Sequence, residues 1–250
     1  MTRTIIPVPR RLVTPQGGWW TGAGSMFFDG VADRVVVSNP LSGTSPWTLI
    51  CSRLFPKDPV ALTASMSFGT FAAGQLIYAG LYNTAGKRVI SGGYRLACEP
   101  DTGVTPDWAR WHRIGVTYSG GAGGTVTVYR DLVAIGSLAY VGSPNITGAL
   151  GYLGTLHLAT FSRGWMHDAR VYDRALSPLE VAADYRGEWV DPTGLVRHWP
   201  LEAKVGATTH ERVGNTMDAV TGAIIDANVV PWRARTASPA RTVSPARSAA

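Results

Sequence analysis

The stretch WHRIGVTYSGGAGGTVTVYRDLVAIGS, residues 111–137, decides the fold class. In RIGVTY and in TVTVYRD, apolar and polar side chains alternate, which is typical of strands that bury one face. SGGAGG between them is suited to a flexible hairpin loop, and LVAIGSLAY follows as a third strand. The pair Trp111–His112 could suggest an active site, but it belongs to no recognisable catalytic motif. We therefore interpret the stretch as part of a sheet and His112 as a structural residue.

The same pattern recurs on both sides of this stretch. SMFFDGVADRVVVSN (25–39) predicts two strands joined at an Asp-Gly turn. WTLICSRLF, LTASMSFGTF, QLIYAGLYN and GYLGTLHLATFSR read as further strands bounded by turns. Strands thus recur about every ten residues, a spacing that predicts an all-β protein, an antiparallel jelly-roll β-sandwich.

One short helix is expected, over SPLEVAADYRG (177–187). Ser177 is placed as the N-cap, Pro178 at the first helical position and Glu180 three residues after the cap, which is a capping box. Gly187 can end the helix. A helix this short must pack on the sandwich, and its predicted apolar face consists of Leu179, Val181, Ala182 and Tyr185.

Positive charge is concentrated at the two ends of the chain. The net charge is +6, yet residues 1–12 and 231–250 contain seven arginines and no acid, so the part between them is close to neutral. A nucleic-acid-binding surface is therefore not expected, nor is a membrane partner, since no long apolar run or signal peptide is visible. The arms could tether the chain to neighbours through Arg3, Arg10, Arg11, Arg233, Arg235, Arg241 and Arg247.

The two cysteines, Cys51 and Cys98, allow one disulfide or none. Both lie in apolar or strand-like surroundings, which favours two buried, inert thiols over a bridge. Neither is part of a CxxC or a Cys/His cluster, so a zinc site is not expected.

Three segments resemble signatures of one superfamily. FFDGVADRVVV, then WHRIGVTYSGG with VTVYRDLVAIGS, then MHDARVYDRALSPLEVAADY resemble the laminin-G-like, concanavalin A-like lectin/glucanase superfamily over residues 25–185. The resemblance implies a concanavalin A-like jelly roll with extended terminal arms. Such modules are usually non-catalytic and bind glycans or proteins, or build larger surface proteins. It also implies that Trp111 packs between the sheets and that His112 points outward or bonds a neighbouring loop.

One segment stands at an unexpected position. Residues 194–222, GLVRHWPLEAKVGATTHERVGNTMDAVTG, resemble a sequence that is often found at the start of domains of this family. It is either a permuted first strand packed on its own sandwich, which we favour because chain ends usually lie close together, or an incomplete module exchanged with another chain. The predicted organisation is an arm over 1–21, a jelly roll over 22–230 and a basic tail over 231–250.

Candidate ligand-binding residues follow from the resemblance and from exposed aromatics. Members of the family often hold Ca²⁺, and the matching positions are Asp29, Asp33 and Asp168; no other cofactor is expected. His167 stands where a second carboxylate is usual. Loop tryptophans are candidates for contact with glycans or other subunits: Trp19, Trp20, Trp108, Trp165 and Trp189. Trp47, Trp111 and Trp199 are expected in the core.

Catalytic patterns are missing from the sequence. No E-x-D-x-x-E motif offers the paired carboxylates of a glycoside hydrolase, and no serine lies in a G-x-S-x-G elbow. We therefore expect no enzyme, and glycoside hydrolysis is the third hypothesis.

The tail TASPARTVSPARSAA (236–250) has no core of its own and becomes ordered only when something holds it. The leading hypothesis is a structural or decoration component of a multimeric surface, specifically of a phage virion, whose partners are copies of itself and other structural proteins. The alternative is a glycan-binding adhesion module at a cell surface or outside the cell.

Overall fold

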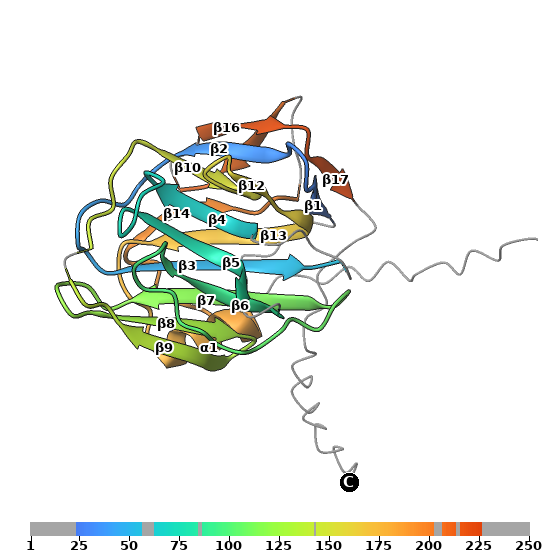
Figure 1. Cartoon of the computed structure of the whole chain (residues 1–250). Helices are drawn as coiled ribbons and strands as arrows, with labels where there is room; N and C mark the ends of the chain where they lie inside the picture. Colours follow the sequence, from blue (N-terminus) through green and yellow to red (C-terminus); the bar gives the residue numbers. More distant parts are fainter. Residues whose placement is uncertain are drawn as a thin grey trace, which may run out of the picture.

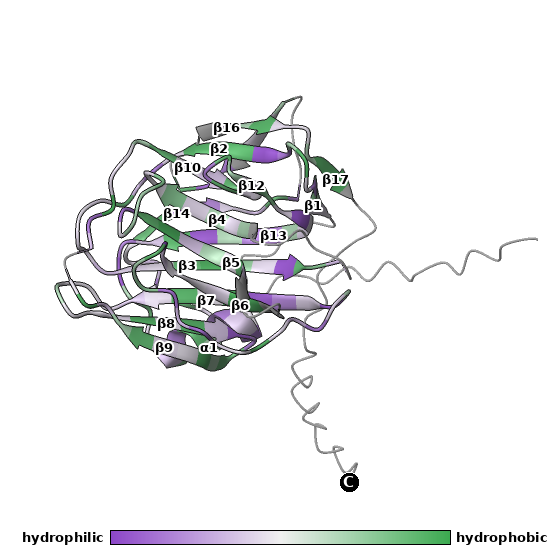
Figure 2. Ribbon diagram, in the orientation of Figure 1, coloured by the Kyte–Doolittle hydropathy of each residue, from purple (hydrophilic) through white to green (hydrophobic). Residues whose placement is uncertain are grey.

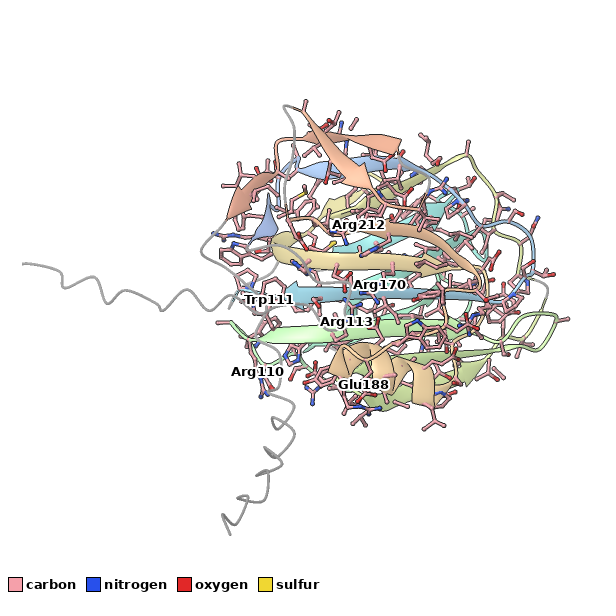
Figure 3. All side chains as sticks on the ribbon, turned by 180° about the vertical axis from the view of Figure 1, so that it is seen from behind. Arg110, Trp111, Arg113, Arg170, Glu188 and Arg212 are labelled. Carbon is pink, nitrogen blue, oxygen red and sulfur yellow. The ribbon has the colours of Figure 1, made fainter. Side chains whose placement is uncertain are left out.

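The computed structural model describes residues 24–56, 63–84, 87–142, 144–202, 207–213 and 216–226. Figure 1 shows a two-layered β-sandwich with one short helix. The front sheet faces the viewer in Figure 1, and the back sheet faces the viewer in Figure 3. The predicted all-β jelly-roll class is confirmed.

The back sheet has eight strands, of which seven follow one another in hydrogen-bonded order and β14 pairs with β13 beside β1. In that order they are β17 (Ile224–Asp226), β1 (Ser25–Asp29), β13 (Arg163–Tyr172), β3 (Trp47–Leu54), β7 (Trp111–Tyr118), β8 (Thr125–Arg130) and β9 (Val133–Ala139), with β14 at Leu195–Trp199.

The front sheet has seven strands. In order they are β15 (Thr208–Glu211), β16 (Thr216–Thr221), β2 (Arg34–Ser38), β10 (Leu150–Leu153), β4 (Thr63–Gly69), β5 (Leu76–Thr84) and β6 (Lys87–Tyr94). A separate small hairpin consists of β11 (Thr155–Leu156) and β12 (Thr160–Phe161).

The core lies between the two sheets, where apolar residues alternate along the strands (Figure 2). Trp47 and Trp199 are fully buried, as predicted. The Trp47 indole donates a hydrogen bond to the Tyr94 hydroxyl at 2.9 Å, so this large ring is buried without an unpaired N–H. Cys51 and Cys98 are buried and not bridged, as predicted.

The C-terminal segment completes both sheets of its own chain. β14 pairs with β13, β16 with β2 and β17 with β1, each antiparallel. In the structure, strands of residues 194–222 thus pair with strands of their own chain, as the favoured alternative has it. In the described ranges, no helix is long and apolar enough to span a membrane.

Helix α1 (Pro178–Arg186) begins and ends as predicted, with Ser177 as N-cap in a capping box with Glu180 and with Gly187 in the left-handed conformation. The predicted apolar face is correct for Val181 but wrong for Leu179. Leu179 is 81% exposed, and the residues that the helix buries are Val181 and Asp184. A carboxylate therefore points from the helix onto the back sheet.

Candidate binding face on the back sheet

A row of apolar side chains crosses five strands of the back sheet at one level. Directly paired residues of antiparallel strands point to the same side of a sheet, and four consecutive pairs link this set. We call it the aromatic row: Ile224, Phe27, Trp165, Leu54 and Trp111.

The row faces outward, away from the core. Met26 and Phe28 on either side of Phe27 are fully buried in the core, and so is Met166 next to Trp165. Successive side chains of a strand alternate between faces, so Phe27 and Trp165 point to the outer side of the back sheet.

The row is open to solvent along its length. Ile224 is 54% exposed and the other four members are partly exposed. The rings of Phe27 and Trp165 lie 4.8 Å apart between centroids, at 52° to each other. Trp165 and Trp111 stand two strands apart, which corresponds to about 10 Å. An elongated ligand could contact both indoles at once.

Part of the outer face is covered. Helix α1 lies over the part of β7 that follows Trp111, and Figure 3 shows Trp111 at the end of β7 that the helix does not reach. The segment after β14 continues the pairing with β13, since the backbone N–H of Asp168 donates to the Pro200 carbonyl at 3.0 Å. The aromatic row thus lies on a part of this face that α1 leaves exposed.

Beneath α1 lies a group of buried ionic side chains, which we call the charge cluster: Arg113, Asp168, Arg170, Asp184 and His198. Asp184 accepts from Arg113 Nε at 2.7 Å and from Arg170 Nη1 at 2.5 Å. Asp168 accepts from Arg170 Nη2 at 2.8 Å. The cluster ties α1 to β7 and β13.

The cluster also holds the C-terminal strand β14. Nε2 of His198 lies 2.7 Å from Oδ1 of Asp168. Asp168 has φ of 49° at an irregularity in the pairing of β13 with β3. This left-handed conformation is strained for a residue other than glycine, and it re-aims the carboxylate toward both arginines and the histidine.

The charges in the cluster offset one another. Burial alone would raise the pKa of Asp168, but Arg170 and Arg113 hold it well below its usual range. Burial lowers the pKa of His198, although Asp168 opposes this effect. Asp168 is therefore an ionised structural acceptor, which is the opposite of the raised pKa that a catalytic acid needs.

Two of the three predicted calcium ligands share one turn, and the third, Asp168, lies elsewhere. Asp29 accepts the backbone N–H of Val31 at 2.7 Å, and Asp33 accepts that of Asp29 at 2.8 Å, so both shape the β1–β2 turn. Asp29 pairs with Arg163, five residues before Asp168 in β13. In the part of the chain that the structure describes, no group of three or more potential metal ligands is found.

The predicted tryptophans are distributed over several surroundings. Trp165 belongs to the aromatic row, Trp189 is 66% exposed after α1, and Trp108 is partly buried against the core. The residues of the two arms lie outside the described residues: Trp19, Trp20, Arg3, Arg10, Arg11, Arg233, Arg235, Arg241 and Arg247.

The expected packing of Trp111 between the sheets is wrong. On β7, Ile114, Val116 and Tyr118 point into the core, so alternation turns Trp111 to the outer face. His112 is buried instead, and its Nδ1 lies 2.7 Å from Oδ2 of Asp131 in the β8–β9 turn. The expectation that it bonds a neighbouring loop is confirmed.

Sequence reasoning did not identify Phe27, Leu54 or Ile224 as surface residues of a site. The alternation of inward and outward side chains along β7 could have revealed the orientation of Trp111. The apolar positions that follow Trp111 define which residues of the strand point inward. The row itself could not be found in this way, because it depends on which strands are neighbours and in which register.

Residues 61–182 match the model of the concanavalin A-like lectin/glucanases superfamily. No curated protein matches the chain significantly in sequence. Solved structures similar to it include a protein from Bacteroides ovatus proposed to bind carbohydrate, with 15% identity and a TM-score of 0.62 over 83% of this chain. The match spans 60% of the Bacteroides ovatus chain.

A heptameric SAP-like pentraxin from Limulus polyphemus has 14% identity and a TM-score of 0.54, with 81% of this chain and 94% of the pentraxin covered. Tailspike protein 2 of an Escherichia coli bacteriophage has 16% identity and a TM-score of 0.49, with 76% of this chain and 31% of the tailspike covered. These likenesses concern the fold. Residues 61–182 thus resemble the concanavalin A-like lectin/glucanases superfamily in sequence, and the strands of the described residues have a jelly-roll arrangement.

Proposed function

We propose that the chain is a non-catalytic carbohydrate-binding module that holds an extended glycan on the aromatic row. The observation that carries the proposal is an outward row with two indoles, Trp165 and Trp111, two strands apart. The C–H groups on one face of a pyranose ring pack against the electron-rich face of an indole. Two such platforms along one line suit successive sugars of an unbranched chain.

Polar side chains lie beside the row, where they can bond sugar hydroxyls. Asp29 and Arg163 form the next exposed cross-strand pair beyond Phe27 and Trp165. Arg110 precedes Trp111 and pairs with Asp107 at 3.5 Å, with both side chains exposed (Figure 3). Sites that bind small polar ligands combine apolar contact area with a few polar groups of this kind.

A binding role fits the carboxylates better than hydrolysis does. Glycoside hydrolysis needs two carboxyl groups that face the substrate, one of them with a raised pKa. Asp168 and Asp184 share Arg113 and Arg170 as partners, but both are buried beneath α1. The fold shared with the Bacteroides ovatus protein proposed to bind carbohydrate agrees with this proposal.

A glycan array followed by calorimetric titration of the best linear oligosaccharide tests the proposal. Trp165→Ala combined with Trp111→Ala should weaken binding about a hundredfold, because tryptophans at the centre of a contact carry most of its energy. Trp189→Ala, which removes an exposed indole outside the row, should leave the affinity unchanged. If the double variant binds like the unsubstituted chain, the row is not the site. If no glycan binds at all, the carbohydrate proposal is wrong.

The role as a virion component stays a prediction, because it was inferred from terminal arms that lie outside the described residues. The predicted arm residues can be tested by trimming 1–12 or 231–250 and measuring assembly.

A further inference from the structure

An arginine of β3 is buried in the core between the two sheets. Arg53 is 0% exposed. Leu49 and Cys51 on the same strand are core residues, and alternation places the side chain of Arg53 on their side of the sheet. The guanidinium carbon lies 6.0 Å from the ring centroid of Phe28 and 5.1 Å from that of Phe55. These cation–π contacts offset part of the cost of burying the charge.

The hydrogen bonds of Arg53 leave two of its three nitrogens unpaired. Nη2 donates to the Ser162 hydroxyl at 2.5 Å and to the Arg163 carbonyl at 3.2 Å, and both acceptors are neutral. Across the ranges that the structure describes, Nε and Nη1 have no hydrogen-bond partner. Burial lowers the pKa of Arg53 to about 10, so the group is still charged at neutral pH. A buried charge with neither a counterion nor a full set of hydrogen bonds is strongly destabilising.

The other buried arginines have the partners that Arg53 lacks. Arg113 and Arg170 of the charge cluster share two buried carboxylates. The chain thus neutralises two buried guanidinium groups in the usual way, with aspartates. At Arg53 no carboxylate of the described residues accepts a hydrogen bond. This contrast indicates that the negative charge beside Arg53 has another source.

A second unpaired polar group lies in the same place. Ser65 of the front sheet is fully buried; its hydroxyl faces the Cys51 thiol, a weak hydrogen-bonding group, and has no partner of good geometry in the described residues. Backbone hydrogen bonds connect Ser65 with the acceptor of Arg53. The Gly154 N–H donates to the Ser65 carbonyl at 2.8 Å, and the Ser162 N–H donates to the Gly154 carbonyl at 2.7 Å. The unpaired hydroxyl and the unpaired guanidinium nitrogens therefore belong to one buried polar group.

We propose that a small monovalent anion, chloride, binds between the two sheets and accepts hydrogen bonds from Arg53 and Ser65. One negative charge neutralises one guanidinium, whereas a doubly charged oxyanion would leave a net charge in the core. Phe28 and Phe55 offer no hydrogen bonds, which favours a spherical ion over an oxyanion whose several oxygens all need donors. A glycan on the aromatic row cannot supply the charge, because Arg53 points to the opposite side of the back sheet. The proposal is therefore independent of the proposed function.

Chloride at this position would connect the two layers of the sandwich. Arg53 belongs to the back sheet and Ser65 to the front sheet. Donors from both sheets are brought together only in the folded chain. A ligand that binds the folded state alone stabilises it by mass action, so the chain should become more stable as chloride is added.

Thermal unfolding of the full chain in mixtures of sodium chloride and sodium gluconate tests the proposal. The ionic strength is kept constant, so that screening of surface charges does not change. Gluconate is much larger than chloride and should not enter the core. The midpoint temperature should rise by roughly 3–5 °C for each tenfold increase in chloride above its dissociation constant.

Two variants and a control assign the effect to the buried group. Arg53→Met retains most of the side-chain length without the charge and should abolish the dependence on chloride. Ser65→Ala removes one donor and should raise the chloride concentration that gives half of the effect. Arg110→Met removes an arginine whose side chain is 62% exposed, and this variant should respond to chloride like the unsubstituted chain.

A crystal of the unsubstituted chain grown in sodium bromide gives a readout that does not depend on the folding of any variant. Bromide takes the place of chloride, and its anomalous signal should lie beside Arg53. The proposal is overturned if that signal is absent, or if the midpoint temperature is the same in chloride and in gluconate. Either result would favour a carboxylate of the chain as the partner of Arg53. A chloride effect that persists in Arg53→Met would overturn the proposal as well.

Discussion

The outer face of the back sheet is divided into two parts with opposite chemistry. The part under α1 contains the charge cluster and has its own cover, whereas the part with the aromatic row is apolar and open. Globular proteins usually arrange this in reverse, with apolar groups under cover and charges in solvent. The covered part is satisfied within the chain: Asp184 accepts from Arg113 and Arg170.

In the open part, the members of the aromatic row are partly or largely exposed. An exposed apolar patch rimmed by polar residues marks a site of interaction. The difference between the two parts therefore teaches that α1 is part of the fold, while the aromatic row is the part that our proposal assigns to a ligand. Substitutions in the covered part should change the free energy of unfolding, whereas substitutions in the open part should change the affinity for a ligand.

The largest effect is expected from Asp184→Ala in the covered part. This substitution removes one of the two carboxylates that the buried Arg113 and Arg170 share, which should lower the free energy of unfolding by about 3–5 kcal/mol. Urea denaturation measures the loss. The control is Leu179→Ala on the exposed side of the same helix, which should change the free energy by less than about 0.5 kcal/mol. Equal effects of the two substitutions would contradict the importance of the charge cluster.

A smaller effect is expected from Ser177→Ala at the start of α1. The Ser177 hydroxyl accepts the backbone N–H of Glu180, and loss of such a cap costs about 1 kcal/mol. The same denaturation assay applies, and Ser177→Asp should restore most of the stability because aspartate is an equally good cap. A cap variant that also weakened glycan binding as much as the tryptophan variants would argue against separate roles for the two parts.

The pH dependence of stability reports on His198. Its pKa is lowered in the folded state, so the unfolded chain binds the proton more readily. Stability should therefore fall as the pH drops below about 6.5. Asp168 acts at lower pH: its lowered pKa gives stability that is present above the unfolded pKa and is lost in acid. The other charged groups facing His198 are Arg170 and Arg212.

His198→Gln tests this assignment, since the glutamine amide can still donate to Asp168 but does not titrate. Unfolding free energies between roughly pH 5 and pH 8 should then vary less with pH than in the unsubstituted chain. An unchanged pH profile would show that another group controls this range.

Local features of the sequence predicted the fold well. The ends of α1 were correct because capping involves neighbours: Ser177 and Glu180 are three residues apart. The buried face of the helix was predicted only in part, because the partners of Asp184 come from elsewhere. Arg113 is 71 residues away in sequence and Arg170 is 14 away. No helical periodicity contains that information, so the predicted face did not include Asp184.

The candidate site was predictable only in part for a related reason. Trp165 was named from its exposed-looking context, but Trp111 was expected in the core because of the resemblance to a family. The alternation of Ile114, Val116 and Tyr118 indicates the correct face. The row that joins Trp111 to Trp165 passes through Leu54, and this neighbourhood arises from strand order, which the sequence pattern does not specify.

The smallest effect on stability is expected from Trp111→Ala in the open part. Trp111 is partly exposed on the outer face, so the free energy of unfolding should fall by less than about 1 kcal/mol. Trp199→Ala, which empties a fully buried site in the core, should cost about 3–5 kcal/mol by the same urea assay. If both substitutions destabilised the chain equally, Trp111 would be part of the core and the aromatic row would not be a binding face. A small cost in stability together with a large loss of glycan affinity would instead show that this half of the back sheet exists for its ligand.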